Sequence, residues 1–231
     1  MMKKIYMLKY FISLCLVITS LSNYAQEKDS TSYKNPYGLR LGIDISKPIL
    51  GMIDSNSSGL EFVADYRITK NWYIAGEFGT QKEITVEDYT TSTSKGTFFK
   101  VGVNYNAYKN LLGMNNEVYV GMRYATSIFD QTLDSYRINT GSDYFVSNTI
   151  SSSSRSTDLN AHWTEFVTGI KVEAFKNLFL GLGFSYKIML NLEHPDNFKT
   201  LYVPGFNRVF ETETGFGFNY TISYTIPFIN K

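Results

Sequence analysis

The sequence has one cysteine, two histidines and no clear excess of charge of either sign. Its only cysteine, Cys15, lies in an apolar N-terminal segment that we expect to be removed. The mature chain then has no disulfide, no thiol nucleophile and no thiolate metal site. Without an excess of basic residues, the chain also has no electrostatic footprint for nucleic acid, so we expect no nucleic-acid partner.

The first 25 residues have the pattern of a signal peptide. Their positively charged start contains Lys3, Lys4 and Lys9. An apolar core follows at residues 11–21, and Ala25 stands before the expected cleavage site. The apolar run is too short to span a bilayer comfortably as an anchor. Its removal leaves 19 basic and 21 acidic residues, and residues 26–36 predict a flexible, polar lead-in.

Beyond this segment the sequence has long alternation in place of long hydrophobic runs. Over residues 214–228 every second position is apolar, and the positions between them hold only glycine or polar residues until Pro227. Such a pattern predicts a strand with one apolar face. A soluble strand averages about 5–6 residues, whereas a tilted strand that crosses a bilayer needs about 9–11. Because lipid excludes an open sheet edge, this strand predicts a closed barrel.

Seven earlier runs alternate in the same way, which gives eight expected strands. The runs are residues 39–46, 60–68, 72–79, 97–108, 118–124, 163–175 and 178–187. Pro48 is expected to end the first strand, because proline cannot donate a hydrogen bond to a strand ladder. Short connections that contain Lys-Asn, at 70–71, 109–110 and 176–177, alternate with longer ones, among them 81–95, 129–161 and 191–213. Barrels of the outer membrane have short periplasmic turns and long external loops.

We therefore predict an all-β fold, an eight-stranded antiparallel up-and-down transmembrane β-barrel. The expected organisation is a signal peptide at 1–25, a periplasmic lead-in at 26–36 and the barrel at 37–231. The expected location is the outer membrane of a Gram-negative bacterium, reached through a cleaved signal peptide. Outer-membrane lipid is accordingly an expected partner.

Charged residues of the expected strands all fall on the face opposite the apolar stripes. They are Arg40, Asp44, Glu61, Asp65, Arg67, Glu77, Lys100, Arg123, Glu165, Lys171, Glu173 and Lys187. An eight-stranded barrel has room inside only for side chains. Opposed charges would pair there as a lumen charge network, because an unpaired buried charge is costly.

A secreted soluble barrel of the lipocalin kind is the alternative, but it would expose long rows of Phe, Leu and Tyr to water. Aromatic residues also gather at the ends of the strands next to the short turns. These residues are Tyr66, Trp72, Tyr105, Tyr108, Phe175, Tyr224 and Phe228. They predict a girdle at the level of the lipid head groups, and the whole pattern favours a membrane barrel.

The segments YGLRLGIDISKPI and ADYRITKNWYIAGEFG, together with the Lys-Asn turns, resemble small outer-membrane proteins of Bacteroidetes. Specifically, the chain is similar to an uncharacterised family of such proteins over nearly its whole mature length. The resemblance implies an outer-membrane β-barrel and supplies no catalytic residues. One departure from the general pattern is that the chain ends at Lys231, three residues after the aromatic Phe228.

Candidates for chemistry are few. His162 follows the serines at 151–154 and precedes Glu165, so a Ser-His-Glu hydrolase can be imagined. In the expected register, however, Glu165 points into the barrel. His194, in the sequence LEHPD, is a weak metal candidate. No phosphate loop, zinc motif or nucleophile elbow occurs, so we expect no enzyme, no cofactor and no metal.

The excursion at 129–161 is the expected interaction element, since loops of this length are usually functional or disordered. Residues 139–142 are a turn signal between two alternating flanks, so the fifth strand can continue there as a hairpin beyond the membrane. Its aromatic anchors are Tyr136, Tyr144 and Phe145, with Trp163 beside them, around a serine-rich tip. The barrel would act as a structural or adhesive protein through this loop. It could instead be an accessory subunit of an outer-membrane assembly or secretion machine, bound to another barrel or a lipoprotein. A lipid-modifying enzyme using His162 and a narrow channel are further alternatives.

Overall fold

The computed structural model describes residues 36–110, 114–138, 149–195 and 198–230. The expected signal peptide, the lead-in up to residue 35, and Tyr144 and Phe145 of the expected partner loop lie outside the described residues. Within these ranges the chain is mostly β-strand, which confirms the predicted all-β class.

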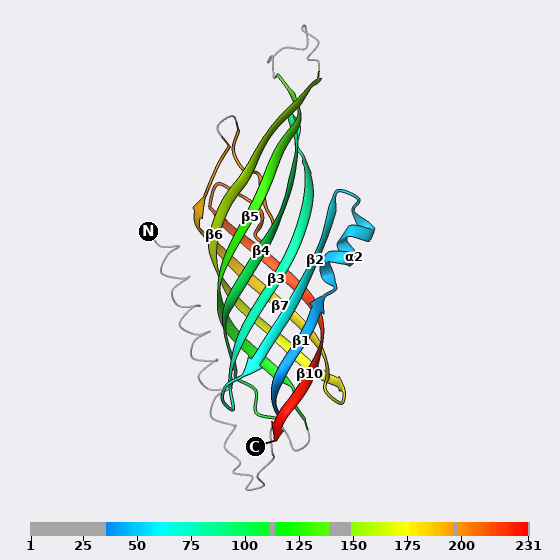
Figure 1. The fold of residues 1–231 in the computed structure, drawn as a ribbon, viewed down its shortest axis with the longest axis vertical. Helices are drawn as coiled ribbons and strands as arrows, with labels where there is room; N and C mark the ends of the chain where they lie inside the picture. Colours follow the sequence, from blue (N-terminus) through cyan, green and yellow to red (C-terminus); the bar gives the residue numbers. More distant parts are fainter. Residues whose placement is uncertain (1–35, 111–113, 139–148, 196–197, 231) are drawn as a thin grey trace, which may run out of the picture. The chain divides into compact units, whose positions relative to one another are not determined.

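In the described part of the chain, eight long strands close into one barrel (Figure 1). They are β1 (Pro36–Asp44), β2 (Ser57–Arg67), β3 (Trp72–Val86), β4 (Thr90–Asn106), β5 (Glu117–Arg137), β6 (Thr149–Phe175), β7 (Leu178–Leu192) and β10 (Thr214–Asn230). Each pairs antiparallel with the next long strand, and β10 pairs with β1 to close the ring. Two short strands, β8 (Tyr202–Val203) and β9 (Asn207–Arg208), form a separate sheet.

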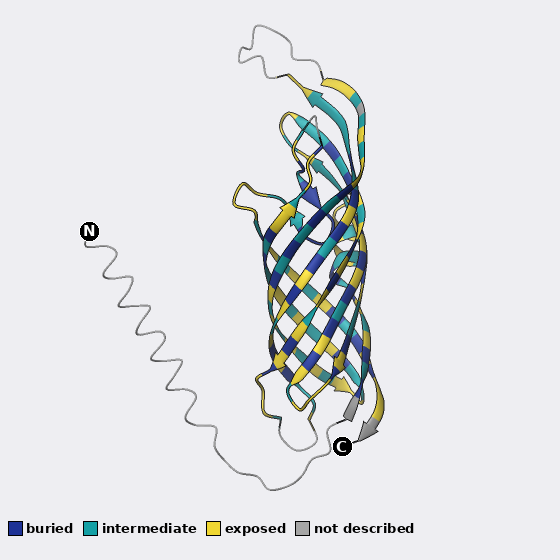
Figure 2. Ribbon diagram, turned by 60° about the vertical axis from the view of Figure 1, so that its left-hand side comes forward, coloured by how far each residue is buried: buried dark blue, intermediate teal, exposed yellow. Residues whose placement is uncertain are grey.

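Side chains alternate between the inside and the outside of the barrel wall. On β3, Tyr73, Ala75 and Glu77 point inward and are buried, whereas Ile74 and Phe78 point outward and are 47% and 53% exposed. Figure 2 shows this alternation as bands of different colour along the strands. Because successive side chains of a strand point to opposite faces, the period-two pattern of the sequence becomes one apolar and one polar surface.

Most strands are longer than their alternating runs, and β3 to β6 are extended the most. The connection expected at 81–95 is mostly strand, since β3 continues to Val86 and β4 begins at Thr90. Likewise β5 continues to Arg137, and Ser151, Ser152 and Ser154 belong to β6 rather than to a loop tip. The extensions of β5 and β6 bury Ala125, Phe129, Leu159 and Ala161. The extensions of β3 and β4 are mostly polar on both faces, so they have no alternation to detect. Their backbone hydrogen bonds to the neighbouring strand do not depend on apolar side chains.

A helix also begins where the first strand was expected to end. The first strand was expected to continue to Ser46 and to end at Pro48, but β1 ends at Asp44 and α2 spans Ser46–Ile53. Pro48 lies in the first turn of α2, where the missing N–H costs no helical hydrogen bond. The Asp44 carboxylate accepts the Ser46 N–H at 2.9 Å and so fixes the start of the helix. Among the described residues, no helix is long and apolar enough to cross a membrane.

Close contact between β4 and β5 generates the first prediction. A Cβ added at Gly102 would clash with the carbonyl group of Met122, whereas a Cβ at Gly76 would lie 3.9 Å from its nearest neighbour, the Lys100 carbonyl oxygen. We expect Gly102→Ala to lower the free energy of unfolding by about 1–3 kcal/mol, since it overpacks a rigid wall. The measurement is the urea midpoint of the folded band in gel electrophoresis of the detergent-solubilised barrel.

Gly76→Ala is the matched control, because it adds the same methyl group to a neighbouring strand where there is space. It should leave the urea midpoint almost unchanged. Equal losses for the two variants would contradict the packing of β4 against β5 described above.

Candidate functional site

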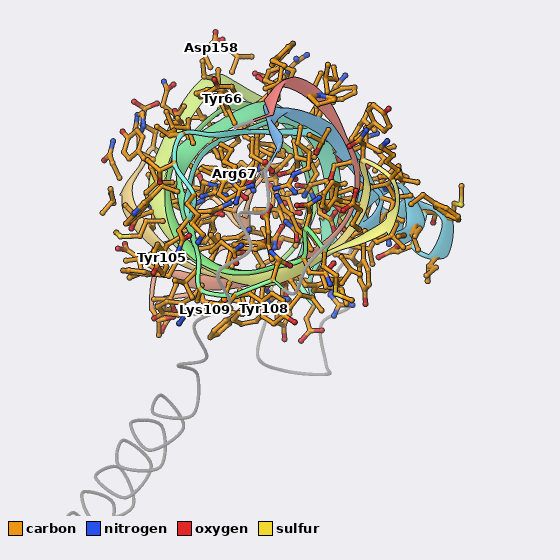
Figure 3. The ribbon with its side chains drawn as sticks, turned by 90° about the horizontal axis from the view of Figure 1, so that it is seen from below. Tyr66, Arg67, Tyr105, Tyr108, Lys109 and Asp158 are labelled. Carbon is orange, nitrogen blue, oxygen red and sulfur yellow. The ribbon has the colours of Figure 1, made fainter. Side chains whose placement is uncertain are left out.

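The interior of the barrel is filled with charged side chains. All twelve charged residues predicted for the lumen lie on inward-facing positions; ten are buried, and Lys171 and Glu173 are partly buried. Figure 3 views the barrel from below, with Arg67 inside the ring of strands and Tyr66 and Tyr105 outside it. The side chains lie in two clusters, one near the short turns and one near the middle of the barrel.

The first cluster is centred on Arg40 of β1. Its Nη2 donates to both carboxylate oxygens of Glu117 on β5 at 2.9 Å, and its Nε donates to Asp65 of β2 at 2.9 Å. Lys171 of β6 donates to the same aspartate. The guanidinium carbon lies 4.7 Å from the centre of the Phe179 ring on β7. This cluster therefore joins five strands across the barrel with two cations and two carboxylates.

The second cluster is centred on Lys100 of β4. Its Nζ lies 2.9 Å from a carboxylate oxygen of Glu77, 3.1 Å from one of Glu61 and 3.7 Å from one of Glu165. Arg123 of β5 donates to Glu77 at 3.2 Å. The ammonium group thus has three carboxylate neighbours from three strands, which offsets the cost of removing these charges from water.

Two members of these clusters were missed by the sequence pattern. Glu117 is the first residue of β5 and shares the parity of Tyr119 and Arg123, so the alternation could have included it. Lys47, which lies 3.4 Å from Glu61, belongs to α2, and no strand pattern could have placed it in the lumen.

Three of the predicted lumen residues form hydrogen bonds to backbone groups. Arg67 donates to the carbonyl oxygens of Thr69 and Lys70 in the short turn after β2. Asp44 accepts the backbone N–H of Tyr220, and Glu173 accepts the backbone N–H of Asn177. These residues fix turns and strand ends.

The connection between β7 and β10 folds back into the barrel. We call residues 201–209 the plug segment. Val203 and Phe206 of this segment are fully buried, and the Phe206 ring packs edge-on against Trp163 at 5.7 Å. The sequence predicted only a long loop here, because the apolar residues of the plug segment have no period that reveals a buried partner.

Two polar side chains of the wall hold the plug segment. Gln81 accepts the N–H of Gly205 at 3.1 Å and donates to the hydroxyl of Tyr202. Lys187 donates to the carbonyl oxygen of Gly205 at 2.7 Å. Gly205 has φ +84°, a conformation that favours glycine. Burial raises the pKa of Tyr202, so its hydroxyl group stays protonated.

The predicted aromatic anchors of the partner loop are not together on an exposed surface. Trp163 is fully buried, and its Nε1 donates to Glu165 at 2.7 Å inside the barrel. Its prediction as an exposed anchor was wrong, because Trp163 shares the inward parity of Glu165. Tyr136 is partly buried near the end of β5, where it pairs with Ile150 of β6.

The two histidines have structural neighbours. His162 lies on the outer side of β6 with its Nδ1 3.1 Å from the Tyr124 hydroxyl, whereas Glu165 points into the lumen. These residues therefore do not form a Ser-His-Glu arrangement, and Glu165 points inward as its register predicted. His194 accepts the N–H of Thr200 at 3.2 Å. The described residues contain no group of three histidine, cysteine or carboxylate side chains that could hold a metal ion.

The fold and the interior together define a closed antiparallel barrel with a charge-filled lumen and a folded plug segment. The chain belongs to the family DUF6048, described as a domain of unknown function, whose family model matches residues 7–231. None of the curated proteins matches the chain in sequence. The resemblance to proteins of Bacteroidetes stays a prediction.

Solved structures that match the chain at low sequence identity include those of two proteins. Neisserial surface protein A (NspA) is 13% identical, with a TM-score of 0.43 over 82% of this chain and 95% of its own. Ail, the attachment invasion locus protein of Yersinia pestis, is 8% identical, with a TM-score of 0.40 over 83% of this chain and 98% of its own. Ail in complex with the heparin analogue sucrose octasulfate has a TM-score of 0.39. At these scores no property of either protein is transferred to this chain.

The Arg40 cluster generates a stability prediction. Arg40→Met leaves Asp65 and Glu117 buried without their main partner, and breaking a buried pair typically costs about 3–5 kcal/mol. We expect a loss of this size in the free energy of unfolding in detergent, measured by urea titration. Adding Glu117→Gln to Arg40→Met should recover part of the loss, because it removes one of the two stranded charges.

Arg155→Met is the matched control. Arg155 pairs with Asp130 outside the lumen, where the two side chains are 61% and 32% exposed, so its loss should cost less than about 1 kcal/mol. A loss for Arg40→Met as small as that for Arg155→Met would contradict a buried, dry charge cluster.

Proposed function

We propose that this chain is a non-enzymatic outer-membrane barrel with a closed lumen, which serves as a scaffold for a projecting hairpin outside the cell. The observation that carries the proposal is the reversed polarity of the barrel. Charged side chains fill the interior, and the outer surface of every strand carries large apolar residues. In water such a surface would be a severe aggregation hazard, whereas in lipid it is the stable arrangement.

Aromatic residues support the same placement. All seven residues of the expected girdle are exposed on the outside: Tyr66, Trp72, Tyr105, Tyr108, Phe175, Tyr224 and Phe228. They lie at the end of the barrel that carries the short turns, with the Trp72 and Tyr105 rings 5.2 Å apart. Amphipathic rings favour the head-group level of a membrane, so this end is the proposed periplasmic side.

The lumen supports a role without steady conduction. The Arg40 cluster lies across the end with the short turns, the Lys100 cluster lies across the middle, and the plug segment fills the other end. Each is held by ion pairs or hydrogen bonds between strands on different sides of the barrel. A narrow channel would need these groups to separate, and nothing in their bonding favours that.

The projecting hairpin is formed by the far ends of β5 and β6, and β4 pairs along it as far as Thr90 and Tyr136. The two strands stay paired as far as Arg137 and Thr149, whereas β6 and β7 pair only as far as Ala161 and Leu192 (Figure 1). A rigid, polar extension of this kind is a suitable surface for a partner, such as another barrel or a lipoprotein. An accessory role in an assembly or secretion machine is the alternative, and it would use the same hairpin. A lipid-modifying enzyme has lost its support, since His162 and Glu165 face opposite sides of β6.

Membrane insertion is tested with the full-length protein. We expect it in the outer-membrane fraction with migration that changes on heating, and we expect no large steady current in planar bilayers, because the lumen is filled. Recovery as a soluble periplasmic protein would overturn the membrane proposal. Porin-like currents would leave the membrane placement intact and overturn the closed lumen.

The hairpin is tested by shortening it where its strands are paired. Leu133 and Ser154 are cross-strand partners, so residues 134–153 can be replaced by Asn-Gly, which forms a two-residue hairpin turn. The barrel should still fold and insert, and partners recovered by gentle affinity purification should be lost.

The control shortens the neighbouring hairpin in the same way, with Asn-Gly in place of residues 85–92 between the paired Ile84 and Thr93. It should retain the partners. If the shortened β5–β6 variant keeps every partner and the wild-type phenotype, the hairpin is not the interaction element.

A further inference from the structure

The barrel wall has a gap in its upper half between β2 and β10. β1 ends at Asp44, opposite Thr221 of β10 and Glu61 of β2. Beyond this point, residues 214–220 of β10 and residues 57–60 of β2 have no strand between them among the described residues. Two side chains bond to the free edge of β10: Asp44 accepts the N–H of Tyr220, and Asn207 donates to the carbonyl oxygen of Phe216. The edge is therefore capped without being closed by a strand.

Helix α2 stands beside this gap, outside the ring of strands (Figure 3). Gly51 of α2 packs against the backbone of Ser57 on β2, and the stem of Lys47 lies against Gly59. On the outer side of the helix, Met52 and Ile53 are 87% and 78% exposed. An apolar helix face at the side of a membrane barrel is stable in contact with lipid. Helix α2 therefore borders the gap with an apolar surface.

A cavity of about 320 Å³ passes through the gap. It is lined by lumen residues such as Lys100 and Glu165, and also by Phe216 and Phe218, which point outward from β10 and are 62% and 60% exposed. Leu50 of α2 lines it as well. A cavity bordered by both faces of one strand connects the lumen to the outer surface of the barrel. Its inner part is charged and its outer part is apolar.

The height of the gap matches a lipid head group. Phe216 lies twelve residues from Phe228 of the girdle on the same strand. A strand tilted by about 40° rises about 2.5 Å per residue, so Phe216 lies roughly 30 Å above Phe228. The apolar band of such barrels is about 25 Å tall. The opening is then at the external head-group level, with chains able to extend downward over the outer wall.

The charges available in the cavity are of both signs. Lys187 donates to the carbonyl oxygens of Gly205 and Phe206, and its Nζ lies 3.9 Å from its nearest carboxylate oxygen, in Glu165. The Nζ of Lys47 lies 3.4 Å from Glu61. An ammonium group has three N–H donors, so each lysine keeps at least one donor for an added anion. At the rim, Asp54 and Glu83 form no ion pair with any described residue. A lining with ammonium donors on one side and carboxylates without an ion pair on the other complements a zwitterion better than it complements a group of one charge.

We propose that this cavity binds the head group of a zwitterionic phospholipid, a phosphoethanolamine, that enters sideways from the membrane. The proposal rests on the membrane placement proposed above. The phosphate lies toward Lys47 and Lys187, the ammonium group lies toward Asp54 and Glu83, and the acyl chains lie over Phe216 and Phe218. A volume of about 320 Å³ is at the lower end of the roughly 300–1,000 Å³ of small-molecule sites, so it takes a head group and leaves the chains outside.

The test is native mass spectrometry of the full protein released from detergent, with dilauroyl phosphatidylethanolamine or dilauroyl phosphatidylglycerol added. We expect one phosphatidylethanolamine to stay bound, and phosphatidylglycerol to bind at least about tenfold more weakly because it has no ammonium group for Asp54 and Glu83. Lys47→Met, which leaves the bonds from Lys187 and Gln81 to the plug segment in place, should weaken binding by about tenfold through the loss of a charge-assisted hydrogen bond. Ser185→Leu should weaken it similarly, because it fills the cavity without disturbing an ion pair.

Thr164→Leu is the control variant, since it adds a similar side chain to the outer face of β6, away from the cavity, and should bind as the wild type does. Soluble phosphoethanolamine should not displace the lipid at equal concentration. Displacement by it would show that the head group comes from water and would overturn lateral entry. Absence of a bound lipid, or equal binding by wild type and Ser185→Leu, in a protein that still migrates as a folded membrane barrel would overturn this inference and leave the proposed function standing.

Discussion

The ion pairs inside the barrel join strands that are distant in the sequence, and the rest of the structure depends on them. Arg40 of β1 reaches Glu117 of β5, and Lys100 of β4 reaches Glu165 of β6. Such charges are tolerable in a dry interior only when each has a partner of opposite sign. Removing the charges from water is costly. A barrel that is apolar outside and charged inside is therefore stable only if the charges in its lumen are paired.

Closure of the ring follows from the same constraint. The outward face of each strand is apolar and suited to lipid. The backbone N–H and C=O groups of a free strand edge would find no hydrogen-bond partner there. β10 pairs with both β1 and β7, and where β1 ends the edge of β10 receives Asp44 and Asn207. The only helix among the described residues, α2, lies at this place. Irregular structure is thus concentrated where the wall is incomplete, and there the charged lumen meets the apolar outer surface.

Sequence alternation predicted the central part of the strands and the inward position of the charges, because both follow from a period of two. It could not predict the extensions of β3 and β4, since residues such as Ser92 and Thr93 are polar on both faces. The turn signal at 139–142 did indicate that β5 continues as a hairpin. Pro48 indicated a strand end, but the structure uses it in the first turn of a helix. The plug segment was also not predictable, because the burial of Val203 and Phe206 depends on Trp163 and Phe98, which are distant in the sequence. Trp163 was predicted to be an anchor of the partner loop because it lies next to that loop. The alternation along β6 places it on the same inward-facing side as Glu165, and this would have predicted its burial.

The central claim is that the barrel is apolar outside and charged inside within a membrane. The only cysteine, Cys15, lies in the expected signal peptide, so single cysteines carrying spin labels can be placed along β3 and β5 of the processed chain without background labelling. In lipid vesicles, labels at Ile74, Phe78 and Val120 should collide readily with oxygen, which concentrates in lipid, and rarely with a water-soluble nickel complex. Labels at Ala75 and Ala125 should be protected from oxygen, so accessibility should alternate with a period of two. Uniform accessibility to the nickel complex, or protection at the outward positions instead of the inward ones, would contradict the account.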